Sequence, residues 1–204
     1  MITHWIPLIG GLFFGLIPPR LLLNSECRYL SFEGFWSRVV TPQKSNQRKR
    51  RWWKLPLVWI DPFRGYVTAW LLTQSFEPVV KAQGFEKIAP LFATALALFI
   101  VVWVQSSGRR QQNETISPCA FLAGMMVSLL PPIVAISAIA IGSATAIALN
   151  SFAAGYIVAM LTTAGFGYLF MGPSLWLPIY TVLVAAPLLL NWIRRTSLVI
   201  PVRC

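Results

Sequence analysis

The chain has 204 residues, of which 56% are hydrophobic and only 11% are charged. Because soluble domains usually carry about a quarter charged residues, this composition excludes an ordinary water-exposed surface. The net charge is +11. In a chain this apolar, we interpret the basic excess as segments that contact the anionic headgroups of a lipid bilayer, and we expect no nucleic-acid partner.

Residues 1–23 are apolar from Trp5 to Leu23, but Gly10-Gly11 and Pro18-Pro19 interrupt them. Two interpretations remain open for this segment: a transmembrane pass, or a re-entrant or interfacial segment. A cleaved signal peptide is not favoured, because no positive region precedes the apolar run and no small-residue cleavage pattern follows it.

Residues 24–87 form a basic, Trp-rich region that we expect to lie on the cytoplasmic membrane surface. Apolar side chains recur at helical spacing from Arg28 to Val40, which predicts an amphipathic interfacial helix. The basic linker from Gln43 to Arg51 is predicted to be a solvated loop, and Trp52-Trp53 are predicted to return the chain to the membrane interface. Asp61-Pro62 is typical of a helix start, and the helix would run to about Phe76. Its apolar core is too short to span a bilayer, so we predict a second interfacial helix.

Residues 88–193 are predicted to be the transmembrane bundle. From Pro118 to Ile193 the chain has 76 residues without a charged residue or a histidine. A helical pass needs about 20 apolar residues. We expect four passes, at about 88–105, 118–141, 143–170 and 174–193. The alternative places Asn150-Ser151 at an interface, with passes at 118–149 and 152–171. The predicted fold class is an all-α membrane protein with four transmembrane helices and a possible fifth at the N-terminus.

Two consecutive prolines, Pro131 and Pro132, lie inside the second expected pass. They remove two backbone donors and clash with the preceding turn, so they predict a hinge. A hairpin at the same place is the alternative.

Charge counting favours the hinge over the hairpin. Cytoplasmic loops carry an excess of Lys and Arg. A kinked single pass puts the basic region and the short basic tail, residues 194–204, on the same side. It leaves Arg109 and Arg110 on the outer side, which counts against it. We therefore predict a multi-pass protein of the cell (inner) membrane with its basic region and C-terminus in the cytoplasm.

Small residues are frequent between Ala135 and Ala159, and several of them recur at intervals of four. Such stripes let helices approach closely, and they also suit the docking of a partner's helix. The candidate packing residues are Ala138, Gly142, Ala146, Gly155 and Ala159.

Polar side chains at expected membrane depth are few. Asn150, Thr162 and Thr163 are candidates for hydrogen bonds between helices or for the lining of a pore. At the cytoplasmic surface, candidate contacts with lipid headgroups are Asp61, Arg64, Arg48, Lys49, Arg50 and Arg51.

The residues that enzymes and metal sites need are scarce. His4 is the only histidine, and the three cysteines are Cys27, Cys119 and Cys204, without a CxxC pair. Zinc sites and buried nucleophiles need partners that this pattern does not offer. We therefore predict no catalytic, cofactor or metal site.

The sequence carries no motif that names a biochemical role. Our first hypothesis is a non-enzymatic scaffold, assembly factor or accessory subunit of a membrane complex, whose partners are the bilayer and other membrane subunits or copies of itself. The alternative is a small oligomeric transporter or channel. A further alternative is an interfacial enzyme that acts on lipid.

Overall fold

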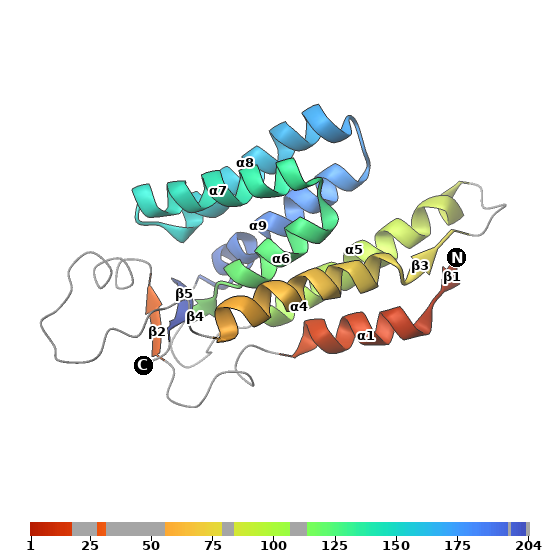
Figure 1. The fold of residues 1–204 in the computed structure, drawn as a ribbon, viewed down its shortest axis with the longest axis horizontal. Helices are drawn as coiled ribbons and strands as arrows, with labels where there is room; N and C mark the ends of the chain where they lie inside the picture. The colour runs from red at the N-terminus through yellow and green to blue at the C-terminus, as the bar shows by residue number, and fades with distance from the viewer. Residues whose placement is uncertain (18–27, 32–55, 79–83, 107–113, 196, 203–204) are drawn as a thin grey trace, which may run out of the picture.

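The computed structural model describes residues 1–17, 28–31, 56–78, 84–106, 114–195 and 197–202. Seven helices account for most of these residues, which confirms the helical fold class (Figure 1). They are α1 (Trp5–Leu16), α4 (Pro56–Thr73), α5 (Phe85–Gln105), α6 (Cys119–Leu129), α7 (Pro132–Ala148), α8 (Phe152–Met171) and α9 (Trp176–Arg194). Within the described residues α5, α8 and α9 are long and apolar enough to cross a membrane, while α1, α6 and α7 are shorter apolar helices.

The helices run back and forth along one axis (Figure 1). Helices α7 and α8 lie on one side of the molecule and α1, α4 and α5 on the other, with α6 and α9 between them. One apolar core lies where α1, α4, α5 and α6 meet, around Leu72, Leu98 and Phe121. A second core joins α6, α7, α8 and α9 around Val134 and Ala138.

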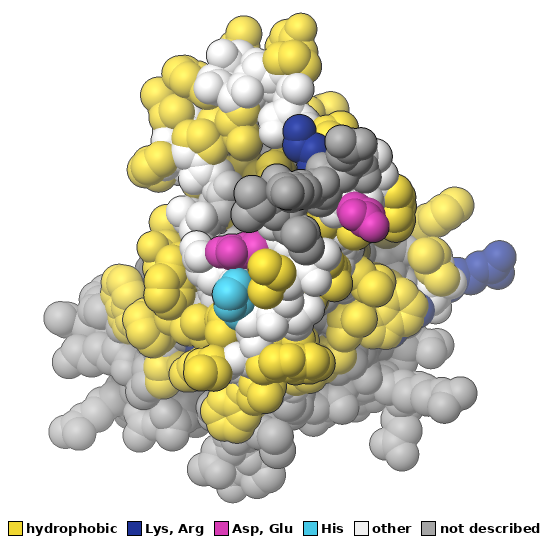
Figure 2. Space-filling view, turned by 90° about the vertical axis from the view of Figure 1, so that its right-hand side faces the viewer, with side chains coloured by type: hydrophobic (Ala, Val, Ile, Leu, Met, Phe, Trp, Pro, Cys, Tyr) yellow, Lys and Arg dark blue, Asp and Glu magenta, His cyan; other side chains and the backbone are white. Residues whose placement is uncertain are grey.

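Short strands join segments at the two ends of the helices. At one end β1 (Ile2–Thr3) pairs antiparallel with β3 (Phe76–Glu77). At the other end β5 (Ser197–Val202) pairs antiparallel with β2 (Arg28–Ser31) and parallel with β4 (Glu114–Ile116). We call these the two-strand end and the three-strand end. Figure 2 faces the two-strand end, where a few charged side chains lie among hydrophobic ones.

The amphipathic helix expected from Arg28 is wrong at its start, where the structure has the strand β2. Residues 28–31 are extended and pair with the C-terminal tail. The tail segment Leu198-Val199-Ile200 is rich in side chains that favour strands, and it supplies backbone partners for β2. This tertiary pairing outweighs the local helical pattern. The rest of the expected helix, residues 32–40, lies outside the described residues.

Helix α4 differs in its bounds from the second interfacial helix that we expected. It begins at Pro56 rather than at Asp61, and Pro62 lies inside it. Thr68, Ala69 and Leu72 are fully buried against neighbouring helices. One face of α4 is therefore packed against the bundle, while Trp59, Phe63 and Trp70 of the same helix are exposed. Asp61 lies within the helix and is not its cap.

At Pro131 and Pro132 the structure differs from the kinked helix that we expected. Leu130 and Pro131 are extended, and Pro132 begins a new helix, α7. A proline disfavours helix in the residue before it but suits the first helical position. Helix α7 then runs back toward the three-strand end, from which α6 comes (Figure 1). The chain forms a hairpin here, the alternative that charge counting had disfavoured.

Asn150 lies in the turn between α7 and α8 with φ of 50°. Asparagine tolerates this left-handed conformation better than most residues. The helices therefore end and begin at Ala148 and Phe152, close to the alternative boundaries, and the expected pass over residues 143–170 is wrong.

Candidate functional site

Helices α7 and α8 are in close contact along a row of small residues. All five candidate packing residues lie there and are buried. A Cβ on Gly142 would lie 2.8 Å from the Cβ of Ala159, and one on Gly155 would lie 2.7 Å from that of Ala146. The row faces inward, between two helices of the same chain.

A pocket of about 410 Å³ lies beside this row, between α6 and the α7–α8 pair. Helix α6 contributes Cys119, Leu122 and Met126, and Val184 of α9 also lines the pocket. Of the lining side chains, only Cys119, Ser143 and Tyr156 carry a hydroxyl or thiol group. The pocket is therefore apolar, with small residues on the α7 and α8 walls.

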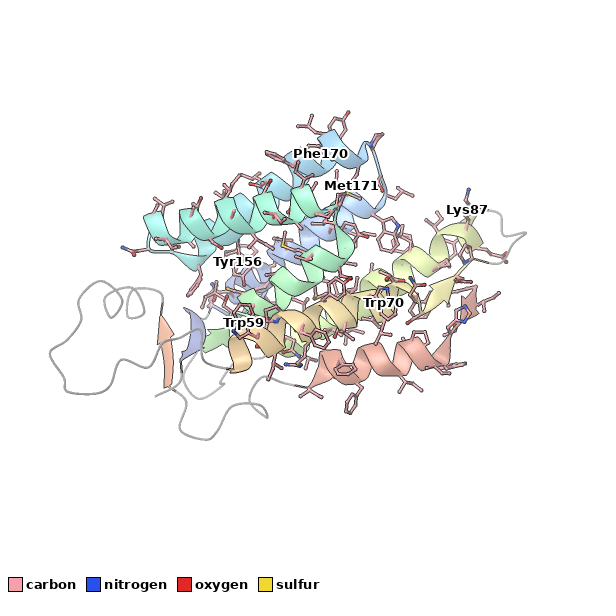
Figure 3. The ribbon with its side chains drawn as sticks, in the orientation of Figure 1. Trp59, Trp70, Lys87, Tyr156, Phe170 and Met171 are labelled. Atoms are coloured by element: carbon pink, nitrogen blue, oxygen red, sulfur yellow. The ribbon has the colours of Figure 1, made fainter. Side chains whose placement is uncertain are left out.

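Three polar groups meet at the end of the pocket where α6 begins. The Tyr156 hydroxyl lies 2.8 Å from Ser117 Oγ and 3.3 Å from Cys119 Sγ, and Ser117 Oγ lies 2.9 Å from Cys119 Sγ. Ser117 and Tyr156 are both buried. We call these three residues the polar cluster. Figure 3 shows Tyr156 between the α7–α8 pair and α6.

A second polar group holds the C-terminal end of α1. Arg64 is only 5% exposed and donates to Asp61 Oδ1 at 2.8 Å and to the carbonyl oxygen of Phe14 at 3.0 Å. It also donates to the carbonyl of Ile17. The last carbonyls of a helix lack partners within the helix and attract cations. Arg64 therefore caps α1, and Asp61 balances its charge.

Gln105 completes this cap from α5. Its side chain is 1% exposed, and Nε2 donates to the carbonyl of Gly15 and, at 2.8 Å, to that of Ile17. Within the described residues, Arg64 Nε and Thr68 Oγ1 nearby have no hydrogen-bond partner. Asp61 and Arg64 thus point into the bundle, rather than toward a headgroup as we had expected.

The structure does not bring the three candidate pore residues together. Asn150 is exposed in the α7–α8 turn. Thr163 is buried and donates to Ala159 O of its own helix at 2.8 Å. Thr162 is half-buried, and none of the three lines the pocket. The four basic candidates at positions 48–51 lie outside the described residues.

Sequence reasoning missed Gly65 and Gly124, where α4 and α6 cross. A Cβ on Gly65 would overlap the carbonyl oxygen of Phe121, and one on Gly124 would overlap that of Pro62. The two backbones are in direct contact here. Each is the only glycine of its helix, but small residues do recur at intervals of four around it, as Gly65 and Ala69 in α4 and as Ala120, Gly124 and Ser128 in α6. This pattern is the signal that could have found the crossing.

Over the described ranges, no three His, Cys, Asp or Glu side chains are grouped closely enough to hold a metal ion. Comparison of the chain with protein-family models, with curated proteins and with solved structures finds no match.

Proposed function

We propose that the chain is a multi-pass integral membrane protein in which α4, α5, α7, α8 and α9 cross the bilayer, while α1 and α6 reach part of the way. The outer surface supports this proposal. Large apolar side chains are exposed on several helices, among them Ile6 (88%), Leu96 (63%) and Leu169 (75%). An exposed apolar surface of this extent is unfavourable in water and favourable against lipid.

Tryptophans near helix ends support the same placement. Trp176 and Trp192 lie near the two ends of α9, about 24 Å apart at 1.5 Å per residue. Trp5 begins α1 at the two-strand end, and Trp103 lies near the opposite end of α5. Tryptophan is enriched at both membrane interfaces.

We propose that the three-strand end faces the cytoplasm. Described residues that flank the basic segments lie at this end. Arg194 donates to Ser106 O at 3.5 Å, and Glu114 pairs with Ser197, so these flanking residues are in contact with one another. By chain connectivity, all Lys and Arg residues except Arg64, Lys81 and Lys87 belong to segments that start or finish here. The proposed crossing of α4 removes the earlier difficulty with Arg109 and Arg110, because α4 and α5 together return the chain to the basic end. The hairpin at Pro131 then returns the C-terminal tail to the same end.

Within this membrane arrangement we propose a non-enzymatic role, as a scaffold or accessory subunit of a membrane complex. The observation that carries the proposal is what the buried charged pair of Arg64 and Asp61 binds. Intramembrane ionisable groups usually mark transport or catalysis. Here Arg64 and Asp61 bind each other and the end of α1, so their role is to hold helices together.

The two alternative functions have less support. A conducting path would need polar side chains along a common cavity, and Asn150, Thr162 and Thr163 do not share one. A lipid-acting enzyme would need Asp61 and Arg64 to reach the headgroups, whereas both side chains are largely buried.

The test of the scaffold role is the state of the full chain in its native membrane. We expect chemical crosslinking in intact membranes, followed by extraction in mild detergent, to give one assembly of fixed stoichiometry containing another membrane protein or further copies. A control chain with Arg48, Lys49, Arg50 and Arg51 changed to Gln tests whether the basic run contributes. A crosslinked sample that runs as a monomer would contradict the role.

A further inference from the structure

Two consecutive arginines at the end of α9 have different surroundings. The Cζ atom of Arg194 lies 5.1 Å from the centre of the Trp103 ring, and the side chain donates to Ser106 O at 3.5 Å. Arg194 therefore holds α9 against the end of α5. Arg195 ends the helix in a left-handed conformation, with φ of 51°, and it is exposed. Its charge therefore lies on the surface of the three-strand end.

An open pocket lies at the same place, and both polar and apolar atoms line it. The lining residues are Asn191, Trp192, Ile193 and Arg195. Trp192 is 79% exposed and Ile193 is 66% exposed. A cation and a carboxamide thus stand next to large exposed apolar side chains. A ligand that suits both kinds of neighbour is amphipathic.

The apolar part of this surface continues along α9. Leu189 is also exposed, and it lies three and four residues before Trp192 and Ile193, so the three side chains share one side of the helix. In the proposed membrane placement Trp192 lies at the interface. Leu189 is then on the acyl-chain side of Trp192, and Arg195, about one turn beyond it, is on the headgroup side. The parts of a phospholipid follow one another in the same order.

The charges at this end favour an anionic headgroup. Arg194 and Arg195 each carry a full positive charge, against about half a negative charge on the last carbonyls of α9. Among the other described residues of the three-strand end, outside the buried charged pair, Arg28 in β2 and Glu114 in β4 offset each other. A guanidinium binds phosphate through two parallel hydrogen bonds. A zwitterionic headgroup brings its own ammonium group, which the arginines repel.

We propose that the end of α9 binds one anionic phospholipid, with the phosphate on Arg195 and the acyl chains along Leu189 and Ile193. The ligand class is a phosphodiester lipid of net negative charge, such as phosphatidylglycerol. This inference rests on the proposed membrane placement, in which the three-strand end lies in the headgroup layer. A free phosphate could share the contact with Arg195, but it would leave the apolar side of the surface unused.

The test is native mass spectrometry of the full chain in mild detergent, with phosphatidylglycerol and with phosphatidylcholine of the same acyl chains. We expect the first phosphatidylglycerol to bind about fivefold more tightly than phosphatidylcholine, as one arginine near anionic lipid contributes. Inorganic phosphate should not displace the lipid. Phosphatidylglycerol with a photoactivatable group on an acyl chain should crosslink to the peptide that contains Leu189 and Ile193.

Variants assign the preference to one side chain. Arg195→Gln should remove most of the preference for phosphatidylglycerol, and Arg195→Lys, which keeps the charge, should retain most of it. Lys87→Gln is the matched control, since Lys87 is an exposed cation at the opposite, two-strand end (Figure 3). It should leave the preference unchanged.

Four results would overturn the proposal: equal binding of the two lipids, a preference that survives Arg195→Gln, crosslinks only to other peptides, or displacement by inorganic phosphate, which would indicate a site for a free anion. An acidic protein segment that occupies Arg195 and that phosphatidylglycerol cannot displace would overturn it too. The membrane placement would survive these results if the chain still needs detergent for extraction. A chain that stays in solution without detergent would contradict the placement itself.

Discussion

Ser117 Oγ lies 2.8 Å from the hydroxyl of Tyr156, although 39 positions separate the two residues. Gly155, the neighbour of Tyr156, is packed against Ala146. Ser117 precedes α6 and Ala146 is near the end of α7, so both ends of the α6–α7 unit meet the first turns of α8. This geometry requires the chain to reverse at Pro131-Pro132, and the orientation of every later helix follows from that reversal.

Where α4 and α6 cross, positions 65 and 124 should not tolerate any side chain larger than the hydrogen of glycine. We expect Gly65→Ala and Gly124→Ala to destabilise the protein by about 1–3 kcal/mol or more, because each new methyl group meets a backbone carbonyl that cannot rotate away. Unfolding in mixed detergent micelles measures the change. Gly165→Ala is the matched control: nothing lies within 4 Å of its added Cβ. It should stabilise by up to about 1 kcal/mol through helix propensity. Equal effects at all three positions would disprove the close crossing.

The α7–α8 contact should show coupling between the two helices. Gly142→Ala places a methyl group 2.8 Å from that of Ala159, so we expect it to destabilise by about 1–3 kcal/mol. Combining it with Ala159→Gly removes the opposing methyl group. The double variant should then lose less stability than the sum of the two single variants. Strict additivity in the double-mutant cycle would show that the two residues do not touch.

Removing the charged cap of α1 should be costly because it leaves Asp61 buried and unpaired. We expect Arg64→Met to destabilise by about 3–5 kcal/mol. Asp61→Asn should cost less, since the amide oxygen can still accept from Arg64. Arg195→Met, at an exposed position, should change stability by less than about 0.5 kcal/mol. An Arg64→Met protein as stable as the Arg195→Met control would rule out the cap.

Gln105 contributes to the same cap without a charge. We expect Gln105→Leu to destabilise by about 1–3 kcal/mol, because the carbonyls of Gly15 and Ile17 lose a donor. Gln74→Leu is the control, since Gln74 is exposed. Limited proteolysis after residue 17 should cut the Gln105→Leu protein faster than the control. Identical cutting rates would show that Gln105 does not hold α1.

Hydropathy located the elements whose whole length is apolar. The segments at 88–105 and 174–193 correspond to α5 and α9, because uninterrupted apolar runs of this length leave few other structures. Helix α4 was predicted as a shorter interfacial helix that starts at Asp61, because Asp61 and Arg64 lower the hydropathy of the segment and Asp61-Pro62 is typical of a helix start. A sequence does not reveal that two charges three residues apart pair with each other inside a bundle.

The hairpin and the strands depend on contacts between distant residues. Pro131-Pro132 is compatible with a kink and with a reversal, and only the partners of Ser117 and Ala146 distinguish them. Strand β2 forms because the tail at 198–200 lies beside it. The same limit applies to the polar cluster. Ser117, Cys119 and Tyr156 carry no shared spacing, so the pocket's polar end could not be predicted.

The most direct test of this arrangement measures which side of the membrane each of several single introduced cysteines faces. In a chain with Cys27, Cys119 and Cys204 replaced, cysteine is introduced at Glu86, Glu114, Asn150 or Arg195 and labelled with a membrane-impermeant maleimide in sealed vesicles of both orientations. The hairpin predicts that positions 114, 150 and 195 label from the cytoplasmic side and position 86 from the other. Position 86 labelled from the same side as 150 and 195, with 114 on the opposite side, would contradict it and restore the kinked single pass.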